Sequence, residues 1–246
     1  MAVTTITDAM VIPFIVLVFG IIFVPKIVDR IVNKDITRSE SRSDQVKENG
    51  FTSELEYLII NGKRKKVPEF SFTDQNGNTI TNRDYLGKVY VVEFFFTTCP
   101  TICPRMNRNL VQIQNTFSEF ENFGVASFTI NPEYDTPQIL KEYAEKYGIT
   151  NPNWHLMTGD QDKIYELANT GFPLYVAQDS EVEGGFEHSG HFALIDKEGF
   201  IRSRVENGNP LIFYNGIISE EEQVDDEGQS QQISMLKQDI AKLLKE

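Results

Sequence analysis

An uninterrupted apolar segment near the middle of the chain limits the folds that this sequence can form. Val89 to Phe96 reads VYVVEFFF, and only Glu93 breaks the run. A segment of strand length without polar alternation is typical of a strand that is buried on both faces of a sheet. A sheet buried on both faces needs cover on both sides, so the segment predicts an α/β domain with a central strand here.

Helices and strands alternate through the rest of the chain. An Asn-Gly turn at Asn76-Gly77 separates two short apolar segments, which predicts a hairpin. Apolar residues recur at spacings of four, three and four between Met106 and Phe117, which predicts an amphipathic helix. The further predicted elements are a strand at Val125–Ile130, helices that begin near Asp135 and Asp160, a hairpin over Asp196–Gly199 and a final helix from Ile233 to Leu244. This order resembles a thioredoxin-like fold, a central mixed sheet flanked by helices.

Composition excludes several classes of protein. The 246 residues include 23 Lys and Arg against 36 Asp and Glu, and the net charge of −13 repels phosphate backbones. We therefore expect no nucleic-acid partner, and we interpret the basic run Lys63–Lys66 as a solvated loop. Hydrophobic residues make up 40% of the chain, which is enough for a core and excludes wholesale disorder.

The first 66 residues differ in character from those that follow. Ala9 to Pro25 contains no charged residue, and residues 33–50 are polar and nearly free of large apolar groups. We expect residues 1–32 to form a single transmembrane anchor, residues 33–66 a polar linker and residues 67–246 one folded domain. A cleaved signal peptide is the alternative, although no small-x-small cleavage site follows the apolar run.

Cys99 and Cys103 are the two cysteines of the chain, which excludes a disulfide-rich scaffold. They lie between the central strand and the following helix, where α/β sheets bind ligands. We expect Pro104 to be the first helical residue and Cys103 the N-cap, so that the helix dipole favours both thiolates. A spacing of four also permits a disulfide. One alternative is that both are buried structural cysteines. Another is a thioredoxin-type redox site, but such a site would have two residues between its cysteines, and this chain has three.

A metal ion held by two thiolates needs a further ligand, and the chain has three histidines. His155 enters a predicted strand and is interpreted as a structural residue. His188 and His191 flank Ser189-Gly190 directly before another strand, in a loop that a thioredoxin-like fold places beside the cysteines. Two thiolates and an imidazole suit copper as Cu(I) or Cu(II), and zinc fits the same ligands.

The most specific motifs are GKVYVVEFFFTTCPTICPRM, NPEYDTPQILKEYA and FEHSGHFALIDKEGFIRS. They resemble the Sco/SenC family of thioredoxin-like copper proteins, and the resemblance covers about Val67 to Leu244. It implies that Cys99, Cys103 and His188 bind copper, with His188 identified by its place eight residues before Asp196. His191 has no counterpart in this pattern. Asp135 matches a family aspartate near the site, and a helix cap would explain it equally well.

The resemblance also implies a function and a location. The expected protein is a membrane-tethered copper chaperone in cytochrome c oxidase assembly, which delivers copper to the binuclear copper site of an oxidase subunit. The alternative is a thiol-disulfide oxidoreductase that reduces the metal-ligand cysteines of that subunit. The family places its domain on the periplasmic or other extracytoplasmic side. Four basic residues after the apolar run favour the opposite orientation by the positive-inside rule: Lys26, Arg30, Lys34 and Arg38.

Overall fold

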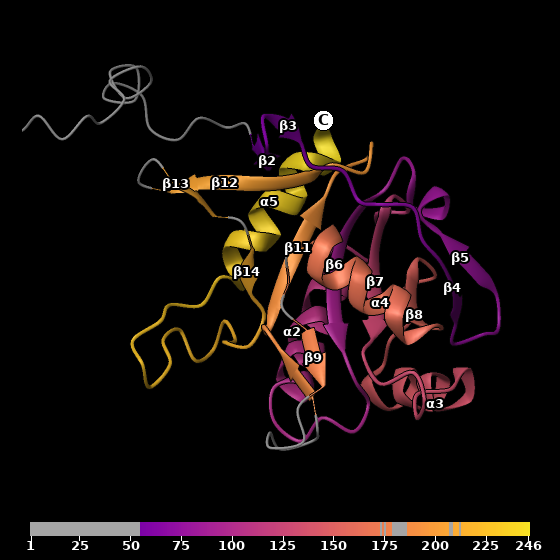
Figure 1. Ribbon diagram of the computed structural model, residues 1–246. Coiled ribbons are helices and arrows are strands. Elements are labelled where there is room, and N and C mark those ends of the chain that lie inside the picture. Colours follow the sequence, from indigo (N-terminus) through magenta and orange to yellow (C-terminus); the bar gives the residue numbers. More distant parts are fainter. Residues whose placement is uncertain (1–54, 173, 175, 179–185, 207–208, 212) are drawn as a thin grey trace, which may run out of the picture. The chain divides into compact units, whose positions relative to one another are not determined.

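The computed structural model describes residues 55–246, with gaps at 173, 175, 179–185, 207–208 and 212 (Figure 1). The predicted anchor at Ala9–Pro25 lies outside these residues. Among the described residues, no helix has the length and apolar character that crossing a membrane requires.

A mixed sheet forms the centre of the domain, with strands in the order β1-β12-β11-β6-β7-β8-β4-β5 (Figure 1). Its strands are β1 (Glu56–Tyr57), β4 (Ser71–Asp74), β5 (Thr79–Thr81), β6 (Val89–Phe95), β7 (Phe123–Thr129), β8 (Trp154–Thr158), β11 (His191–Ile195) and β12 (Ile201–Glu206), with β13 (Asn209–Leu211) on β12 and β14 (Tyr214–Asn215) on β11. The β6–β7 and β7–β8 pairs are parallel, whereas β11 and β12 join antiparallel. Two separate hairpins are formed by β2 (Ile59–Ile60) with β3 (Lys63–Arg64), and by β9 (Val176–Gln178) with β10 (Phe186–His188).

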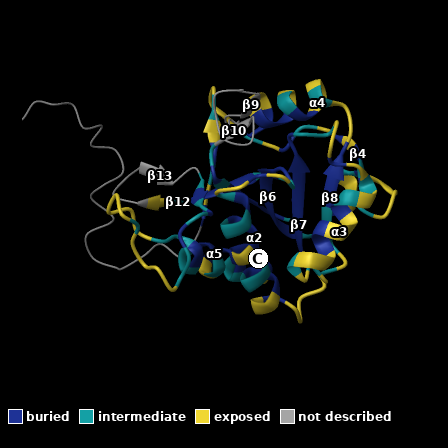
Figure 2. Cartoon of the chain, turned by 90° about the horizontal axis from the view of Figure 1, so that it is seen from below, coloured by how far each residue is buried: buried dark blue, intermediate teal, exposed yellow. Residues whose placement is uncertain are grey.

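Helices cover both faces of this sheet. They are α2 (Cys103–Thr116), α3 (Pro137–Tyr147), α4 (Gln161–Glu166), which continues into a π-helical turn at Leu167–Gly171, and α5 (Ile233–Lys245); a short 3₁₀ helix spans Asn82–Tyr85. Figure 2 shows α4 on one side of the central strands and α2 and α5 on the other. The predicted α/β layering is therefore confirmed.

The central strand is buried on both faces, as its apolar sequence predicts. All seven residues of β6 are buried. Phe94 points to the α4 side, where its ring lies 5.8 Å from that of Phe172, while Phe95 points the other way and lies 5.5 Å from Tyr143 of α3. Successive strand residues face opposite sides, so a run without polar alternation supplies both halves of the core.

The folded domain begins before Val67, the boundary expected from the sequence. Leu55 and Leu58, which we expected in the polar linker, are buried, and β1 pairs with β12 at the edge of the sheet. The Leu55 carbonyl accepts a hydrogen bond from Arg202 Nη2 at 2.6 Å. The segment is short and polar on average, so its few buried apolar residues carry little periodic signal in the sequence.

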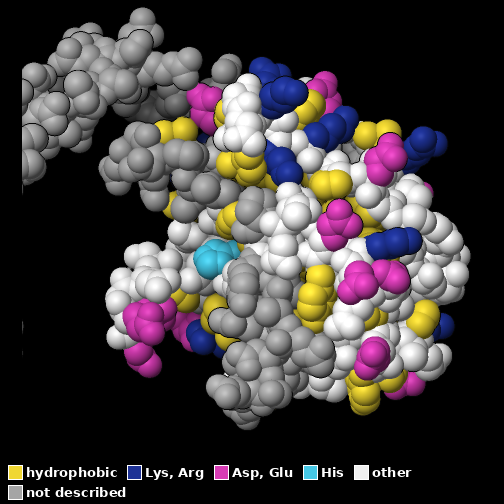
Figure 3. Space-filling model, in the orientation of Figure 1, with side chains coloured by type: hydrophobic (Ala, Val, Ile, Leu, Met, Phe, Trp, Pro, Cys, Tyr) yellow, Lys and Arg dark blue, Asp and Glu magenta, His cyan; other side chains and the backbone are white. Residues whose placement is uncertain are grey.

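The basic run is also part of the fold, and it is not a free loop. Lys63 and Arg64 form β3, the Arg64 guanidinium lies 3.9 Å from the centre of the Tyr57 ring, and Lys65 Nζ donates to the Thr170 carbonyl. Figure 3 shows several basic side chains near the top of the visible face, where Figure 1 places β2 and β3, and acidic and basic side chains interspersed over the rest.

Candidate metal centre

The two cysteines lie side by side where β6 passes into α2. Cys99 is 7% exposed and Cys103 is fully buried. The Cys103 backbone N–H points to Cys99 Sγ, with a nitrogen–sulfur distance of 3.4 Å. No disulfide joins the two sulfurs to each other. The pair therefore has an outer sulfur near the surface and an inner sulfur in the core.

Burial decides the protonation of the inner thiol. α2 begins at Cys103 with Ile102 as its N-cap, one residue earlier than expected. Desolvation raises the pKa of Cys103 well above its usual range, and the neighbouring Cys99 raises it further. For Cys103 the expectation that the helix dipole favours the thiolate was wrong, because a terminal dipole is weaker than the cost of a charge in the core.

Asp135 fixes the strand end that leads to the cysteines. Its carboxylate accepts hydrogen bonds from the Thr97 backbone N–H, at 3.1 Å, and from the hydroxyls of Thr97 and Thr129. The helix cap of α3 is instead Thr136, whose hydroxyl accepts from the Ile139 N–H. Of the two explanations open for Asp135, the helix cap is thus excluded. The residue joins β7 to the loop that carries Cys99.

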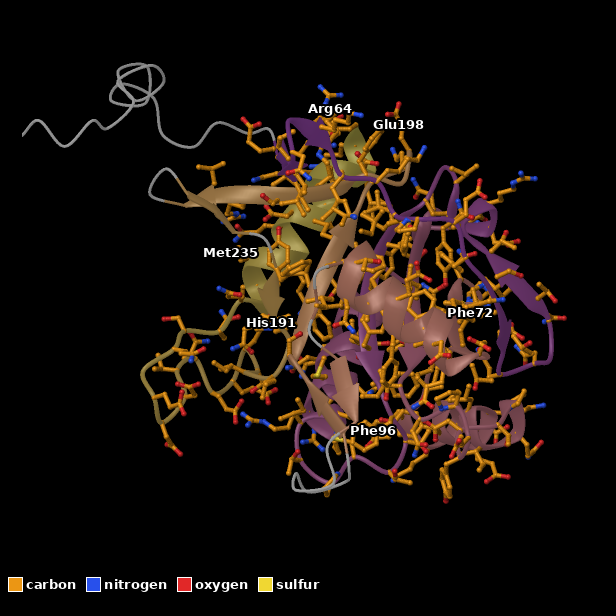
Figure 4. All side chains as sticks on the ribbon, in the orientation of Figure 1. Arg64, Phe72, Phe96, His191, Glu198 and Met235 are labelled. Atoms are coloured by element: carbon orange, nitrogen blue, oxygen red, sulfur yellow. The ribbon has the colours of Figure 1, made fainter. Side chains whose placement is uncertain are left out.

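The topology of the sheet brings the histidine turn to the same place. β11 runs antiparallel to β6, with Ala193 opposite Val92, so the start of β11 lies beside the end of β6. Figure 4 shows His191, the first residue of β11, and Phe96, the first residue after β6. The turn between His188 and His191 therefore lies near the loop that contains Cys99.

A close contact joins this turn to the cysteine helix. Gly190 has a φ of 65°, and a Cβ atom on it would lie 3.4 Å from Ile102 Cδ1 and 2.5 Å from Ile217 Cδ1. Glycine suits both the positive φ and the lack of space. Ile102 directly precedes Cys103, so the turn after His188 packs against the start of α2.

The three histidines have different surroundings. His188 ends β10 opposite Val176, and its side chain lies outside the described part of the chain. His191 is half-buried, and burial lowers its pKa. His155 lies on β8, where its Nδ1 is 3.1 Å from Asp74 Oδ2, in agreement with a structural role. Within the described residues, no three His, Cys, Asp or Glu side chains form a metal-binding group.

Glu93, the polar residue that breaks the apolar run of the central strand, is a fully buried acid. Ser127 donates a hydrogen bond to its Oε1 at 2.7 Å, while Oε2 is buried without a hydrogen-bond partner among the described residues. Desolvation raises the pKa of Glu93 to about 7. The negative charge of Glu93 contributes to the raised pKa of the Cys103 thiol. The sequence signal for this buried acid was a single glutamate within the apolar run of the predicted central strand.

Comparison with known proteins identifies relatives for most of the chain. A profile of the family described as SCO1/SenC matches residues 60–217. A SCO1 protein homolog of Bacillus subtilis is 32% identical over 182 residues, which cover 70% of this chain and 93% of the relative.

Solved structures agree with the fold. A SCO1/SenC family lipoprotein from Bacillus anthracis has a TM-score of 0.60 at 27% identity, over 73% of this chain and 95% of that one. BsSco, described as a member of the Sco family of cytochrome c oxidase assembly proteins with a disulfide switch, has a TM-score of 0.59 at 24% identity, over 76% and 98%. Arabidopsis thaliana ScoI with copper bound has a TM-score of 0.54 at 21% identity, over 73% and 98%. These likenesses confirm the predicted thioredoxin-like α/β fold.

Proposed function

Because the chain belongs to the SCO1/SenC family, we propose that it binds copper through Cys99, Cys103 and His188 and delivers it during cytochrome c oxidase assembly. One observation carries the proposal: the turn after His188 packs against Ile102, directly before Cys103. Copper bound to ScoI of Arabidopsis thaliana supports the choice of metal. The recipient would be the oxidase subunit that holds the binuclear copper site.

The donor set suits copper as a cargo. Thiolates favour Cu(I), and an added imidazole makes the same site acceptable to Cu(II). Cys103 is fully buried and its pKa is raised, so copper has to displace a thiol proton to reach it. Cys99, at the surface side of the pair, is the first sulfur that an incoming ion or partner meets.

Copper titration with single substitutions tests the ligand set. We expect one copper per chain, loss of binding in Cys99→Ser and Cys103→Ser, and weaker Cu(II) binding with a changed EPR spectrum in His188→Ala. His155→Ala is the matched control, because it removes an imidazole that pairs with Asp74 elsewhere in the sheet. Unchanged stoichiometry and affinity in both serine variants would reject the site.

The redox state of the pair gives a second prediction. Oxidation to a Cys99–Cys103 disulfide should abolish copper binding, because the disulfide sulfurs are no longer anionic donors. Metal analysis of the oxidised protein, with the disulfide verified by mass spectrometry, measures this. Stoichiometric copper in the disulfide form would contradict it.

A second candidate function is thiol-disulfide exchange with the oxidase subunit, favoured by the outer and inner arrangement of the two sulfurs. Cys99 would attack a partner disulfide, and Cys103 would then resolve the mixed disulfide. The chain would become the disulfide, and the partner would gain two electrons and two protons as two thiols. His188 discriminates the functions: His188→Ala should retain exchange but lose tight copper binding.

We further propose that Ala9–Pro25 tethers the domain to a membrane, on the extracytoplasmic side. The family lipoprotein of Bacillus anthracis supports a tether. Ala9–Pro25 contains no charged residue, which suits a segment that inserts into a membrane. Protease treatment of intact spheroplasts tests the orientation, and full protection of the domain until the membrane is broken would refute it.

A further inference from the structure

A buried amide connects α2 to the segment that follows β14. The Asn109 side chain is 2% exposed, and its Nδ2 donates hydrogen bonds to the carbonyl oxygens of Gly216, at 2.9 Å, and Ile217, at 3.3 Å. An asparagine in the buried face of a helix is costly unless its amide is paired. These bonds pair it and hold the segment against the helix.

The same segment holds the turn that follows His188. The Gly216 N–H donates to the Gly190 carbonyl oxygen at 3.0 Å, and β14 pairs with the start of β11. The Asn215 side chain accepts from the Ile217 N–H at 2.9 Å, which keeps this short segment in shape. Displacement of Gly216 from α2 would therefore displace the Gly190 turn as well.

Side-chain packing completes the connection back to α2. Gly190 lies against Ile217 and Ile102, in the close contact described above. Ile102 and Asn109 are seven residues apart, which is about two helical turns, so they lie on the same side of α2. The turn is held to this helix twice, by packing beside Cys103 and by the Asn109 amide through Gly216.

We propose that Asn109 is a positioning residue for the metal site. Its amide keeps the turn after His188 at the start of α2, and thereby fixes the place from which the third ligand reaches the cysteine pair. The inference rests on the proposed copper function and deepens it, since Asn109 is not itself one of the proposed ligands. Groups that orient metal ligands commonly change metal affinity by about 10- to 100-fold.

An exposed ion pair joins the same two parts of the chain. Arg105 Nη2 lies 2.7 Å from Glu222 Oε1, and their side chains are 37% and 46% exposed. Exposed ion pairs contribute little and are screened by salt. We therefore assign the positioning to the buried amide, and Glu222→Gln serves as the control for the exposed connection.

Three variants of the 246-residue chain test the proposal. Asn109→Asp keeps the shape of the side chain but removes the donor. Gln114→Ala is the matched control, because Gln114 is a buried amide on the same helix whose bonds go to Gly148 and Thr150 instead. We expect Asn109→Asp to weaken Cu(II) binding by about tenfold or more and to change the Cu(II) EPR spectrum. Gln114→Ala and Glu222→Gln should bind Cu(II) as the wild type does.

A double-mutant cycle separates positioning from general loss of stability. In a His188→Ala background, Asn109→Asp should have no further effect on Cu(II) affinity, because the ligand that it positions is gone. Wild-type binding by Asn109→Asp, equal weakening by Gln114→Ala, or a full additional effect in the His188→Ala background would each overturn the inference. If His188→Ala itself binds like the wild type, the proposed ligand set fails, which is a different result.

Discussion

At the scale of single residues, Glu93 is the group whose burial has the clearest cost. It is fully buried in the central strand, and one of its two carboxyl oxygens has no hydrogen-bond partner among the described residues. The pKa rises from 4.5 to about 7 because desolvation disfavours the charged form. The folded state therefore holds the Glu93 proton more tightly than the unfolded state does. Stability from this group is present below pH 4.5 and is lost as the pH rises through about 7.

Glu93→Gln should remove this pH dependence. The shift corresponds to about 3 kcal/mol of unfolding free energy between acidic and mildly alkaline pH. The unfolding free energy of the variant, relative to that of the wild type, should thus increase by about 3 kcal/mol as the pH rises from about 4 to about 8. Urea denaturation across this range measures the difference, with the exposed Glu119→Gln as control. A constant difference between wild type and Glu93→Gln at all pH values would show that Glu93 does not titrate this way.

At the scale of elements, two neighbouring residues at the start of α3 have different roles. One caps the helix, and the other holds the loop before Cys99 in place. Thr136 caps the helix, whereas the neighbouring Asp135 holds Thr97 and Thr129. Thr136 therefore stabilises the start of α3, whereas Asp135 holds the loop that leads to Cys99. The two roles cannot be told apart from the sequence Asp-Thr-Pro, because both residue types are good caps.

Substitution of each residue should separate the two roles. Thr136→Ala should cost about 1 kcal/mol of stability and leave copper affinity unchanged. Asp135→Asn should cost about 1–3 kcal/mol, because the amide group cannot accept all of the bonds that the carboxylate accepts. It should also weaken copper binding, since the loop before Cys99 loses its clamp. Unfolding free energies and copper titrations measure both effects, and equal copper affinities in the two variants would argue against a loop role.

Helices and strands could be predicted from the sequence where an apolar pattern or a turn motif marked them. The apolar run of β6, the hairpin over Asn76-Gly77 and the apolar face of α5 were all found from local patterns. The same patterns could not show that Asn109 reaches Gly216, or that Gly190 lies on Ile102. Those contacts join segments about 80 to 110 residues apart, and only the antiparallel placement of β11 beside β6 brings them together.

At the scale of the whole domain, the residues before Val67 complete the sheet. β1 pairs with β12, Leu55 and Leu58 are buried, and the buried guanidinium of Arg202 donates to the Leu55 carbonyl. A domain cut at Val67 would expose apolar surface, leave β12 as an open edge and remove one partner of a buried charge. Open edges of this kind favour aggregation, so the segment contributes to solubility as well as stability.

Two fragments should therefore behave differently, one that begins at Thr52 and one that begins at Val67. Burial of a leucine side chain contributes about 1.5–3 kcal/mol, so loss of Leu55 and Leu58 should lower the unfolding free energy by about 3–6 kcal/mol. That is a large part of the stability of a typical domain. Urea denaturation measures the loss, and Leu58→Ala in the longer fragment should reproduce part of it. The folded shorter fragment should keep wild-type copper affinity, because the segment that it lacks packs on β12 and not on the cysteine loop. Equal unfolding free energies of the two fragments would show that the residues before Val67 do not contribute to the folded domain.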